Sequence, residues 1–191
     1  MTRSYTKGKR AEHEAETRQR IVEAALALHG EIGPNGTTIS LIAERAGVQR
    51  HTVYAHLPDE RSTLMACSGM HMERAPLPSP DGWSGLDEPE ARLRAGLSAL
   101  YGWFERNEQL LALVFRDAET NDTLREVSEL RFGGPLGAIY QSLATGLPPG
   151  AAPALTLALS FHTWRTLGRN AGLDTSKAVD LMVRTVRCAV G

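Results

Sequence analysis

The spacing of apolar residues constrains the fold most strongly, because it repeats at the helical period along nearly all of the 191-residue chain. One such stripe, from about residue 14 to residue 32, contains Ile21, Ala25, Leu28 and Ile32. No segment shows the strict alternation of apolar and polar residues that is typical of a half-buried strand. The sequence therefore predicts an all-α protein of about nine helices.

Proline, glycine and charge divide the chain into regions. Residues 76–89 hold four prolines and two glycines, which predicts a linker between a domain over residues 14–75 and a helical domain over residues 90–191. A helix from Glu60 to about Arg74, capped by Asp59, should complete the first domain. Residues 1–13 carry four basic residues before the first acid at Glu12, so we expect a flexible basic arm there.

Composition excludes several classes of protein. A hydrophobic content of 42% is that of a globular chain, and the longest apolar runs are too short to span a bilayer. The first residues lack the apolar core of a signal peptide, so we expect a cytoplasmic protein. Cys67, Cys188 and the histidines show no ligand spacing, which predicts neither a metal site nor a cofactor. Phosphate-binding, dinucleotide-binding and nucleophile motifs are missing as well, so no catalytic residue is predicted.

The segment from Ala46 to Asp59, AGVQRHTVYAHLPD, concentrates polar side chains behind a glycine turn. A short helix that begins after Thr38 should end at Gly47, and a second should begin near Gln49 or Arg50. Two short helices joined by such a turn form a helix-turn-helix, whose second helix enters the DNA major groove. The alternative is a small helical bundle whose polar surface has no role.

The two faces of the second helix differ in character. Val53 and Leu57 should point inward, and the outward face near its start should carry Arg50, His51 and Thr52. Arginine can donate two hydrogen bonds to a guanine edge, and threonine can contact a base or a thymine methyl group. Tyr54 and His56 suit phosphate oxygens.

Residues 37–64, TTISLIAERAGVQRHTVYAHLPDERSTL, resemble the DNA-binding segment of the tetracycline-repressor (TetR) family of bacterial transcriptional regulators. The matching residues are Thr37, Thr38, Ile42, Ala43, Ala46, Gly47, Val48, Thr52, Val53, Tyr54, His56 and Leu64. The resemblance covers about residues 14–74. It implies an N-terminal three-helix DNA-binding domain followed by a helical ligand-binding and dimerisation domain.

Residue by residue, the resemblance implies two kinds of DNA contact. Bases would be contacted by Ser40, Gln49, Arg50, His51 and Thr52, and phosphates by Thr38, Tyr54 and His56. Glu60 stands where the family commonly has a phosphate-binding lysine, so we expect Arg61 to take that role. Gln49 replaces the serine that usually caps the recognition helix, which predicts a weakly capped helix with the Gln49 side chain free.

Aromatic residues of the second domain are candidates for the ligand pocket that the resemblance implies, and plain core is the alternative for each. They are Trp103, Phe104, Phe115, Phe132, Tyr140, Phe161, His162 and Trp164. His162 lies on an otherwise apolar face, where a core histidine is the alternative to a ligand contact. Arg116, Asp117 and Glu119 form a charged cluster of the kind that usually faces solvent.

The last two predicted helices, over residues 153–168 and 176–190, are apolar on most of their circumference. They either form a four-helix bundle with a second subunit or pack entirely within their own chain. The expected interface residues are Leu155, Leu159, Val179, Val183 and Val186.

Together these features predict a homodimeric transcriptional repressor that binds a palindromic DNA operator, has no membrane association, and is released by an unidentified small-molecule effector. A helical protein-binding adaptor and a small enzyme with an apolar pocket are the alternatives from other classes.

Overall fold

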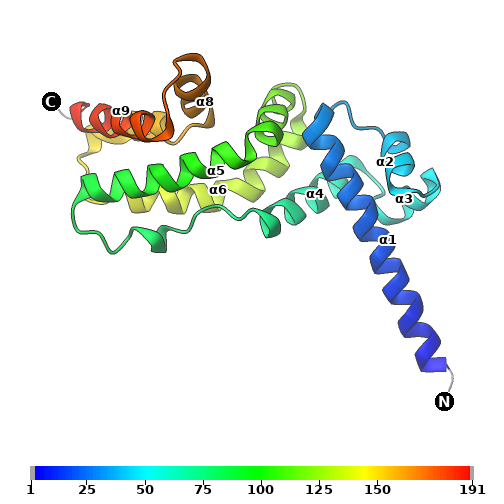
Figure 1. Cartoon of the computed structure of the whole chain (residues 1–191). Coiled ribbons are helices and arrows are strands. Elements are labelled where there is room, and N and C mark those ends of the chain that lie inside the picture. Colours follow the sequence, from blue (N-terminus) through cyan, green and yellow to red (C-terminus); the bar gives the residue numbers. More distant parts are fainter. Residues whose placement is uncertain (1–2, 190–191) are drawn as a thin grey trace. The chain divides into compact units, whose positions relative to one another are not determined.

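The computed structural model describes the backbone of residues 3–189 and side chains from residue 8 onward, and this part of the chain is helical without strands (Figure 1). Its nine α-helices are α1 (Arg3–Ile32), α2 (Ile39–Ala46), α3 (Arg50–His56), α4 (Glu60–Arg74), α5 (Pro89–Ala118), α6 (Asp122–Ala144), α7 (Ala152–Ala158), α8 (Phe161–Arg165) and α9 (Thr175–Cys188). Short 3-10 turns at Pro80–Gly82 and Pro149–Ala151 and a π turn at Thr166–Asn170 complete the described elements.

The chain forms two compact units. The first comprises the residues up to Pro76 together with Gln109–Arg131, and the second comprises Leu77–Glu108 and the residues from Phe132 onward. Helices α5 and α6 therefore contribute to both units. Residues 109–131, which the sequence assigns to the second domain, group with the N-terminal helices instead.

The core of the first unit is built from the apolar stripe of α1 and the inward faces of α2, α3 and α4. Its buried members are Ile21, Val22, Ala24, Ala25, Leu28, Ile42, Ala43, Ala46, Val53, Leu57 and Cys67. The Cys67 thiol donates to the Val22 carbonyl over 3.8 Å, and burial raises the pKa of this thiol to about 12. Cys188 is exposed.

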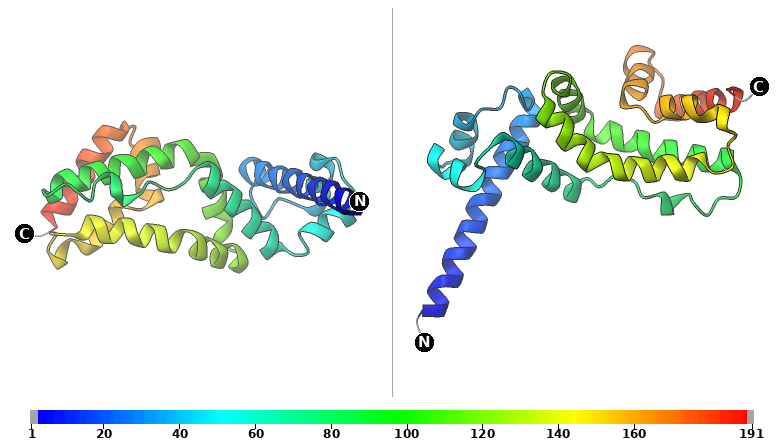
Figure 2. Two further views of the ribbon diagram at one scale, coloured as in Figure 1. Left: turned by 90° about the horizontal axis from the view of Figure 1, so that it is seen from below. Right: turned by 180° about the vertical axis from the view of Figure 1, so that it is seen from behind.

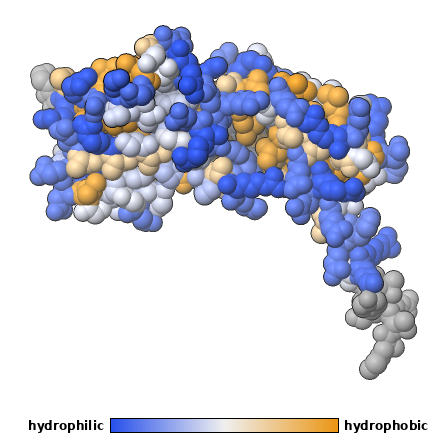
Figure 3. Space-filling model, viewed as in Figure 1, coloured by the Kyte–Doolittle hydropathy of each residue, from blue (hydrophilic) through white to orange (hydrophobic). Residues whose placement is uncertain are grey.

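Helix α1 begins much earlier than the sequence predicts. We expected a flexible arm over residues 1–13, but the helix starts at Arg3, and residues 1 and 2 lie outside the described part. The reason is composition: residues 1–13 contain no proline, and the strong helix formers Lys7, Lys9, Arg10, Ala11 and Glu12 follow closely on one another. Its turns over residues 8–16 are exposed on all sides, and the coloured part of α1 directly above the grey atoms in Figure 3 is hydrophilic.

The second unit contains most of α5, the second half of α6, and α7 to α9. Helices α5 and α6 lie side by side (Figure 2), and the rings of Trp103 on α5 and Phe132 on α6 are 6.3 Å apart. The sequence predicts that Gly133-Gly134-Pro135 breaks or kinks a helix, yet α6 continues through Pro135. Trp83, within the predicted linker, is buried with 3% of its surface exposed, so this segment contributes to the core.

The predicted single helix over residues 153–168 is interrupted. Ser160 has an extended backbone (φ −76°, ψ 132°) and separates α7 from α8. Ser160 occupies the position before α8 but makes no side-chain capping hydrogen bond. The Tyr101 hydroxyl donates to the Ala158 carbonyl over 2.8 Å, which satisfies an acceptor at the interruption.

Four of the five expected interface residues are buried within a single chain. Leu155, Val179, Val183 and Val186 have at most 1% of their surface exposed, and Leu159 is half-buried. The prediction that these four form a dimer interface is therefore wrong: α7 and α9 use these faces for their own core. The exposed apolar residue of α7 is Leu157, with 51% of its surface accessible. Among the described residues, no helix has the length and apolarity to cross a bilayer.

Candidate nucleic-acid interface

Helix α2 begins where the sequence predicts. Thr38 has an extended backbone, and its side-chain oxygen accepts a hydrogen bond from the Leu41 amide over 3.3 Å. Such a cap satisfies one of the amides that a helix start leaves without a partner and contributes about 1 kcal/mol. Ile42, Ala43 and Ala46 are buried on the opposite face.

The turn after α2 depends on glycine. Gly47 adopts the left-handed conformation (φ 66°, ψ 39°), which residues with a Cβ atom rarely adopt. Its amide donates to the Glu44 carbonyl over 3.2 Å, and the Val48 amide donates to the Ala43 carbonyl over 3.0 Å. This pair of bonds is a Schellman motif, which ends α2 within one residue and turns the chain into α3.

Helix α3 separates buried from exposed residues as predicted. Val53 is fully buried and Leu57, at its C-terminal end, has 1% of its surface exposed. Gln49 occupies the position before the helix and is exposed. Its side chain makes no capping hydrogen bond, as the sequence predicts. Arg50 and His51, on the outward face of α3, are exposed as well.

The nine predicted DNA contacts lie on α2, α3 and the start of α4, all within the first unit. Thr38, Gln49, Arg50, His51, Tyr54 and Arg61 are exposed, and Ser40, Thr52 and His56 are half-buried. Tyr54 has 53% of its surface exposed, a large value for an aromatic residue with no interior role. The roles of these residues in binding DNA remain predictions.

Helix α4 has the predicted bounds and the predicted cap. The Asp59 carboxylate accepts a hydrogen bond from the Ser62 backbone amide at 2.7 Å, and the Ser62 hydroxyl oxygen accepts one from the Asp59 backbone amide at 3.2 Å. These two bonds form a capping box. The hydrogen bonds from Ser62 lower the pKa of the Asp59 carboxyl. Arg61 forms an exposed ion pair with Glu126 of α6 at 2.8 Å.

This arrangement agrees with comparisons to known proteins. The sequence profile described as "Bacterial regulatory proteins, tetR family" matches residues 21–59, which span the end of α1, α2, α3 and the cap of α4. The HTH-type transcriptional repressor KstR of Mycolicibacterium smegmatis is 26% identical over 186 residues, 91% of this chain and 88% of that protein. KstR of Mycobacterium tuberculosis is 25% identical and covers 91% and 82%. The chain is therefore similar to the TetR family in its DNA-binding segment, and to repressors described as HTH-type over most of its length.

Solved structures show the same fold. A TetR-family regulator from Marinobacter aquaeolei VT8 aligns with a TM-score of 0.60 at 19% identity, over 94% of this chain and 98% of that one. One from Streptomyces coelicolor gives a TM-score of 0.63 at 18% identity, over 92% and 80%. The match to TetR-family regulators and the likeness to transcriptional repressors support a DNA-binding transcriptional regulator and not an enzyme.

A buried carboxylate holds the turn that precedes the TetR-type α2. Asp117 at the end of α5 has 4% of its surface exposed and accepts hydrogen bonds from the Asn35 amide (2.9 Å) and from Nε of Arg116 (2.8 Å). Nη2 of Arg116 also donates to the Ile32 carbonyl over 3.2 Å. Asp117 was expected to face solvent, and that prediction is wrong.

Asn121, in the turn between α5 and α6, extends this network. Its side-chain amide donates to Oδ1 of Asn35 (2.9 Å) and to Glu60 at the start of α4 (2.8 Å), and its oxygen accepts from the Leu124 amide (2.9 Å). We call Asn35, Arg116, Asp117 and Asn121 the Asp117 clamp. The clamp joins the α5–α6 turn to the segments that lead into α2 and α4.

The clamp imposes two further requirements on its surroundings. Gly33 has a φ of 90°, and a Cβ atom there would overlap Asp117 and Arg116. His29, 5% exposed, lies near the clamp: burial lowers the pKa of its imidazole to about 4, and the Asp117 charge only partly opposes this shift.

The structure gathers only part of the predicted TetR ligand pocket. Trp103, Phe104, Phe161 and Trp164 are buried, and the Phe104 ring lies 5.5 to 5.9 Å from those of the other three. Phe132 joins the cluster through Trp103, whereas Tyr140 is half-buried and His162 is exposed. Phe115 belongs to the first unit.

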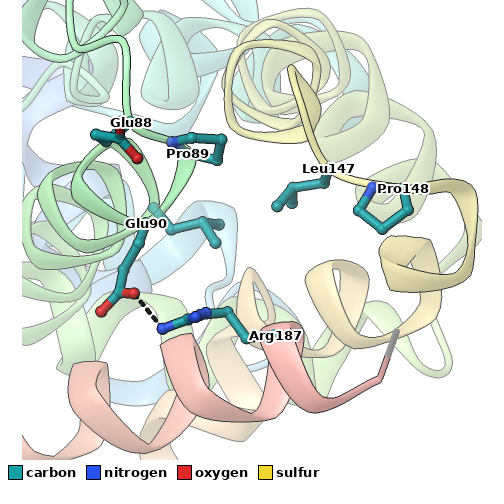
Figure 4. A pocket seen from close by; sticks show the side chains of 7 residues that line it. Glu88, Pro89, Glu90, Leu147, Pro148 and Arg187 are labelled. Carbon is teal, nitrogen blue, oxygen red and sulfur yellow. Dashed lines mark hydrogen bonds and ion pairs between the residues drawn. The ribbon is translucent and has the colours of Figure 1, made fainter. Parts of the chain in front are cut away.

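A groove of about 300 Å³ opens at the start of α5 in the second unit (Figure 4). It is lined by Glu88, Pro89, Glu90, Leu93, Leu147, Pro148 and Arg187. Arg187 is the one cation among these residues, and it forms an ion pair with Glu90. In the described part of the chain, no group of three or more histidine, cysteine or acidic residues could hold a metal ion.

Proposed function

We propose that this chain is a homodimeric repressor that binds a palindromic operator and is released from it by a small molecule. The observation that carries the proposal is the outward face of α3, where Arg50 and His51 are exposed while Val53 on the opposite face is fully buried. The relatives named above as transcriptional repressors support repression as the outcome. As a bacterial DNA-binding protein, the chain would act in the cytoplasm.

Two copies are needed because one recognition helix is short. Helix α3 has seven residues, so a single copy reaches only one half-site in one major groove. A two-fold dimer would present two such helices about 34 to 36 Å apart, in successive major grooves. Leu157, exposed on α7, is a candidate for the dimer contact in place of the buried residues of α7 and α9.

Base and phosphate contacts would divide along the helix. Gln49, Arg50 and His51 stand at the start of α3, where base edges are met, with Thr52 and Ser40 beside them. Tyr54, His56 and Thr38 would contact phosphates. Arg61 can join them because its exposed pair with Glu126 contributes at most about 1 kcal/mol and is easily exchanged for a phosphate.

The repressor would be released from its operator if the ligand binds more tightly to a conformation of the protein that binds DNA poorly. We propose the aromatic cluster of the second unit as the ligand-binding region, because it is the largest group of buried rings described. Helix α5 carries Trp103 and Phe104 of this cluster and also Asp117 of the clamp. A displacement of α5 would therefore reach the turn before α2 and the start of α4 through hydrogen bonds.

The proposal is tested by selecting DNA fragments from a random pool with the purified protein. We expect a two-fold symmetric consensus, with affinity that falls steeply as salt is added, because phosphate contacts release counterions. A consensus without symmetry would overturn the dimeric arrangement. Failure to enrich any sequence, or affinity indifferent to salt, would overturn DNA recognition by this face.

Two substitutions separate base contacts from phosphate contacts. Arg50→Ala should reduce discrimination between the selected site and a site altered at one base pair by about 1 to 3 kcal/mol. Tyr54→Phe should weaken binding to both sites by similar factors, because a phosphate contact carries no sequence information. Fluorescence anisotropy with the two duplexes measures both effects. An Arg50→Ala protein with unchanged discrimination would contradict the assignment of Arg50.

A further inference from the structure

A second groove lies in the first unit, between α1 and α4. Its volume is about 350 Å³, and its lining residues are Arg18, Val22, Met65, Ala66, Gly69, Met70, Glu73 and Arg131. Val22 is buried in the core of the DNA-binding helices, and Ala66 and Met70 pack against that core. Met65 packs on the neighbouring cluster of Leu64, Leu124 and Val127. The floor of the groove is therefore apolar, and methionine side chains adapt readily to a ligand.

Arg131 of α6 lies at this groove as a half-buried cation. Its Nη2 donates to the Met65 carbonyl (2.9 Å), and its Nε donates to the Ser68 hydroxyl (3.2 Å). Nη2 lies 3.3 Å from the place of a Cβ atom on residue 69, so glycine there leaves room for the guanidinium group. Arginine has five N–H donors, and these contacts use two of them.

In the part of the chain whose side chains are described, no carboxylate forms an ion pair with Arg131. Among residues 8–189, neither Arg131 nor Arg18 forms an ion pair. A half-buried charge without a counter-charge is costly, and an anion would remove that cost. The groove of Figure 4 differs in this respect, because its Arg187 is paired with Glu90.

We propose that the groove between α1 and α4 binds a small amphipathic carboxylate. The carboxylate would take the remaining donors of Arg131 in the bidentate geometry that arginine favours, and the apolar part would lie on Met65, Ala66 and Met70. Arg18 and Arg131 carry two positive charges and Glu73 one negative charge, so the groove has a net charge of +1, which matches a monoanion. A doubly charged phosphate would be repelled by Glu73. The volume lies in the range of small-molecule sites.

This site is separate from the proposed effector region and does not depend on the proposed DNA binding. It is built by α1 and α4, which carry the core of the DNA-binding helices, so a ligand there would contact that unit directly.

The probe is octanoate, titrated calorimetrically into the full chain without DNA, and 1-octanol is the uncharged comparison. We expect octanoate to bind at one site per chain at least about tenfold more tightly than octanol, because hydrogen bonds to a charged group are strong. Arg131→Met should lower the affinity for octanoate by a similar factor. Arg125→Met is the matched control on the same helix, where Arg125 is exposed and pairs with Asp122, and it should bind as the unaltered chain does. Equal binding of octanol, or an Arg131→Met protein with full affinity, would overturn the proposal.

Location and folding are checked independently. With methionine methyl groups labelled for NMR, octanoate should shift the signals of Met65 and Met70 and leave that of Met182, buried in the second unit, unchanged. A shift of Met182 alone would place the ligand in the other unit and overturn the site. Arg18→Glu alters only an exposed side chain, so it keeps the fold while reversing a lining charge, and it should weaken octanoate several-fold without affecting octanol.

Discussion

Replacing Gly33 with alanine is expected to lower the free energy of unfolding by about 3 kcal/mol. Two effects add: the backbone at residue 33 has a φ of 90°, which an alanine adopts with strain, and the new methyl group would overlap the Asp117 carboxylate and the Arg116 guanidinium. Asp117 is buried, so it has little room to move. Urea denaturation followed by circular dichroism measures the change.

Gly30→Ala is the matched control for this substitution. Gly30 lies three residues earlier within α1, and a Cβ atom there meets nothing within 4 Å. Because alanine favours a helix more than glycine, this variant should be as stable as the original chain or more stable by about 0.5 to 1 kcal/mol. Equal stability of the two variants would contradict the strain and overlap assigned to Gly33.

Stability should fall by about 3 kcal/mol through His29 alone as the pH drops from about 6.5 to about 4. Above pH 6.5 the imidazole is neutral in both the folded and the unfolded chain, so it has no effect there. Below that value His29 binds a proton in the unfolded chain, whereas in the folded chain the buried imidazole stays neutral until the pH approaches 4. His29→Leu removes this proton uptake, and its stability should therefore depend less on pH over the same interval.

Urea denaturation at pH 7, 5.5 and 4 measures the difference between the two proteins, which isolates His29 from the carboxylates that both retain. His13→Leu is the control for loss of a histidine side chain, because His13 lies exposed on the same helix. If the free energy of unfolding changes equally with pH in His29→Leu and in the original chain, His29 binds its proton equally well in the folded and the unfolded chain, which would contradict the prediction.

The helix-turn-helix could be predicted from the sequence because local signals define it. Thr38, Gly47 and Asp59 act on their immediate neighbours, so capping and turn rules place the ends of α2 and α4 correctly. The inward positions of Val53 and Leu57 follow from helical period alone. These parts need no knowledge of distant contacts.

The Asp117 clamp could not be predicted in this way because its partners are far apart in sequence. Asn35 and Asp117 are 82 residues apart, and a charged cluster is usually exposed. One signal was present: Leu110, Val114 and Asp117 stand at positions i, i+4 and i+7, which places Asp117 on the same face of α5 as those two apolar residues. A carboxylate in register with an apolar stripe indicates a buried acceptor that needs donors.

The end of the chain was predicted least well. Apolar residues on both sides of α7 and α9 indicated that these helices are buried. The pattern did not show whether they pack against a second subunit or against the rest of their own chain. The interruption at Ser160 was missed because the apolar period continues across it, while the Tyr101 hydroxyl that satisfies the interruption comes from α5.

Pro135 within α6 makes the two helices shared by both units mechanically unequal. Proline has no amide hydrogen, so the carbonyl four residues earlier, that of Arg131, lacks its usual helical partner, and Gly133 and Gly134 soften the same turn. The compact units divide α6 at this place, between Arg131 and Phe132. Helix α5 has neither glycine nor proline after Gly102, so it is the stiffer rod and α6 the more pliable one. Force applied along the pair would bend α6 and be carried mainly by α5, which ends at Asp117 and Ala118.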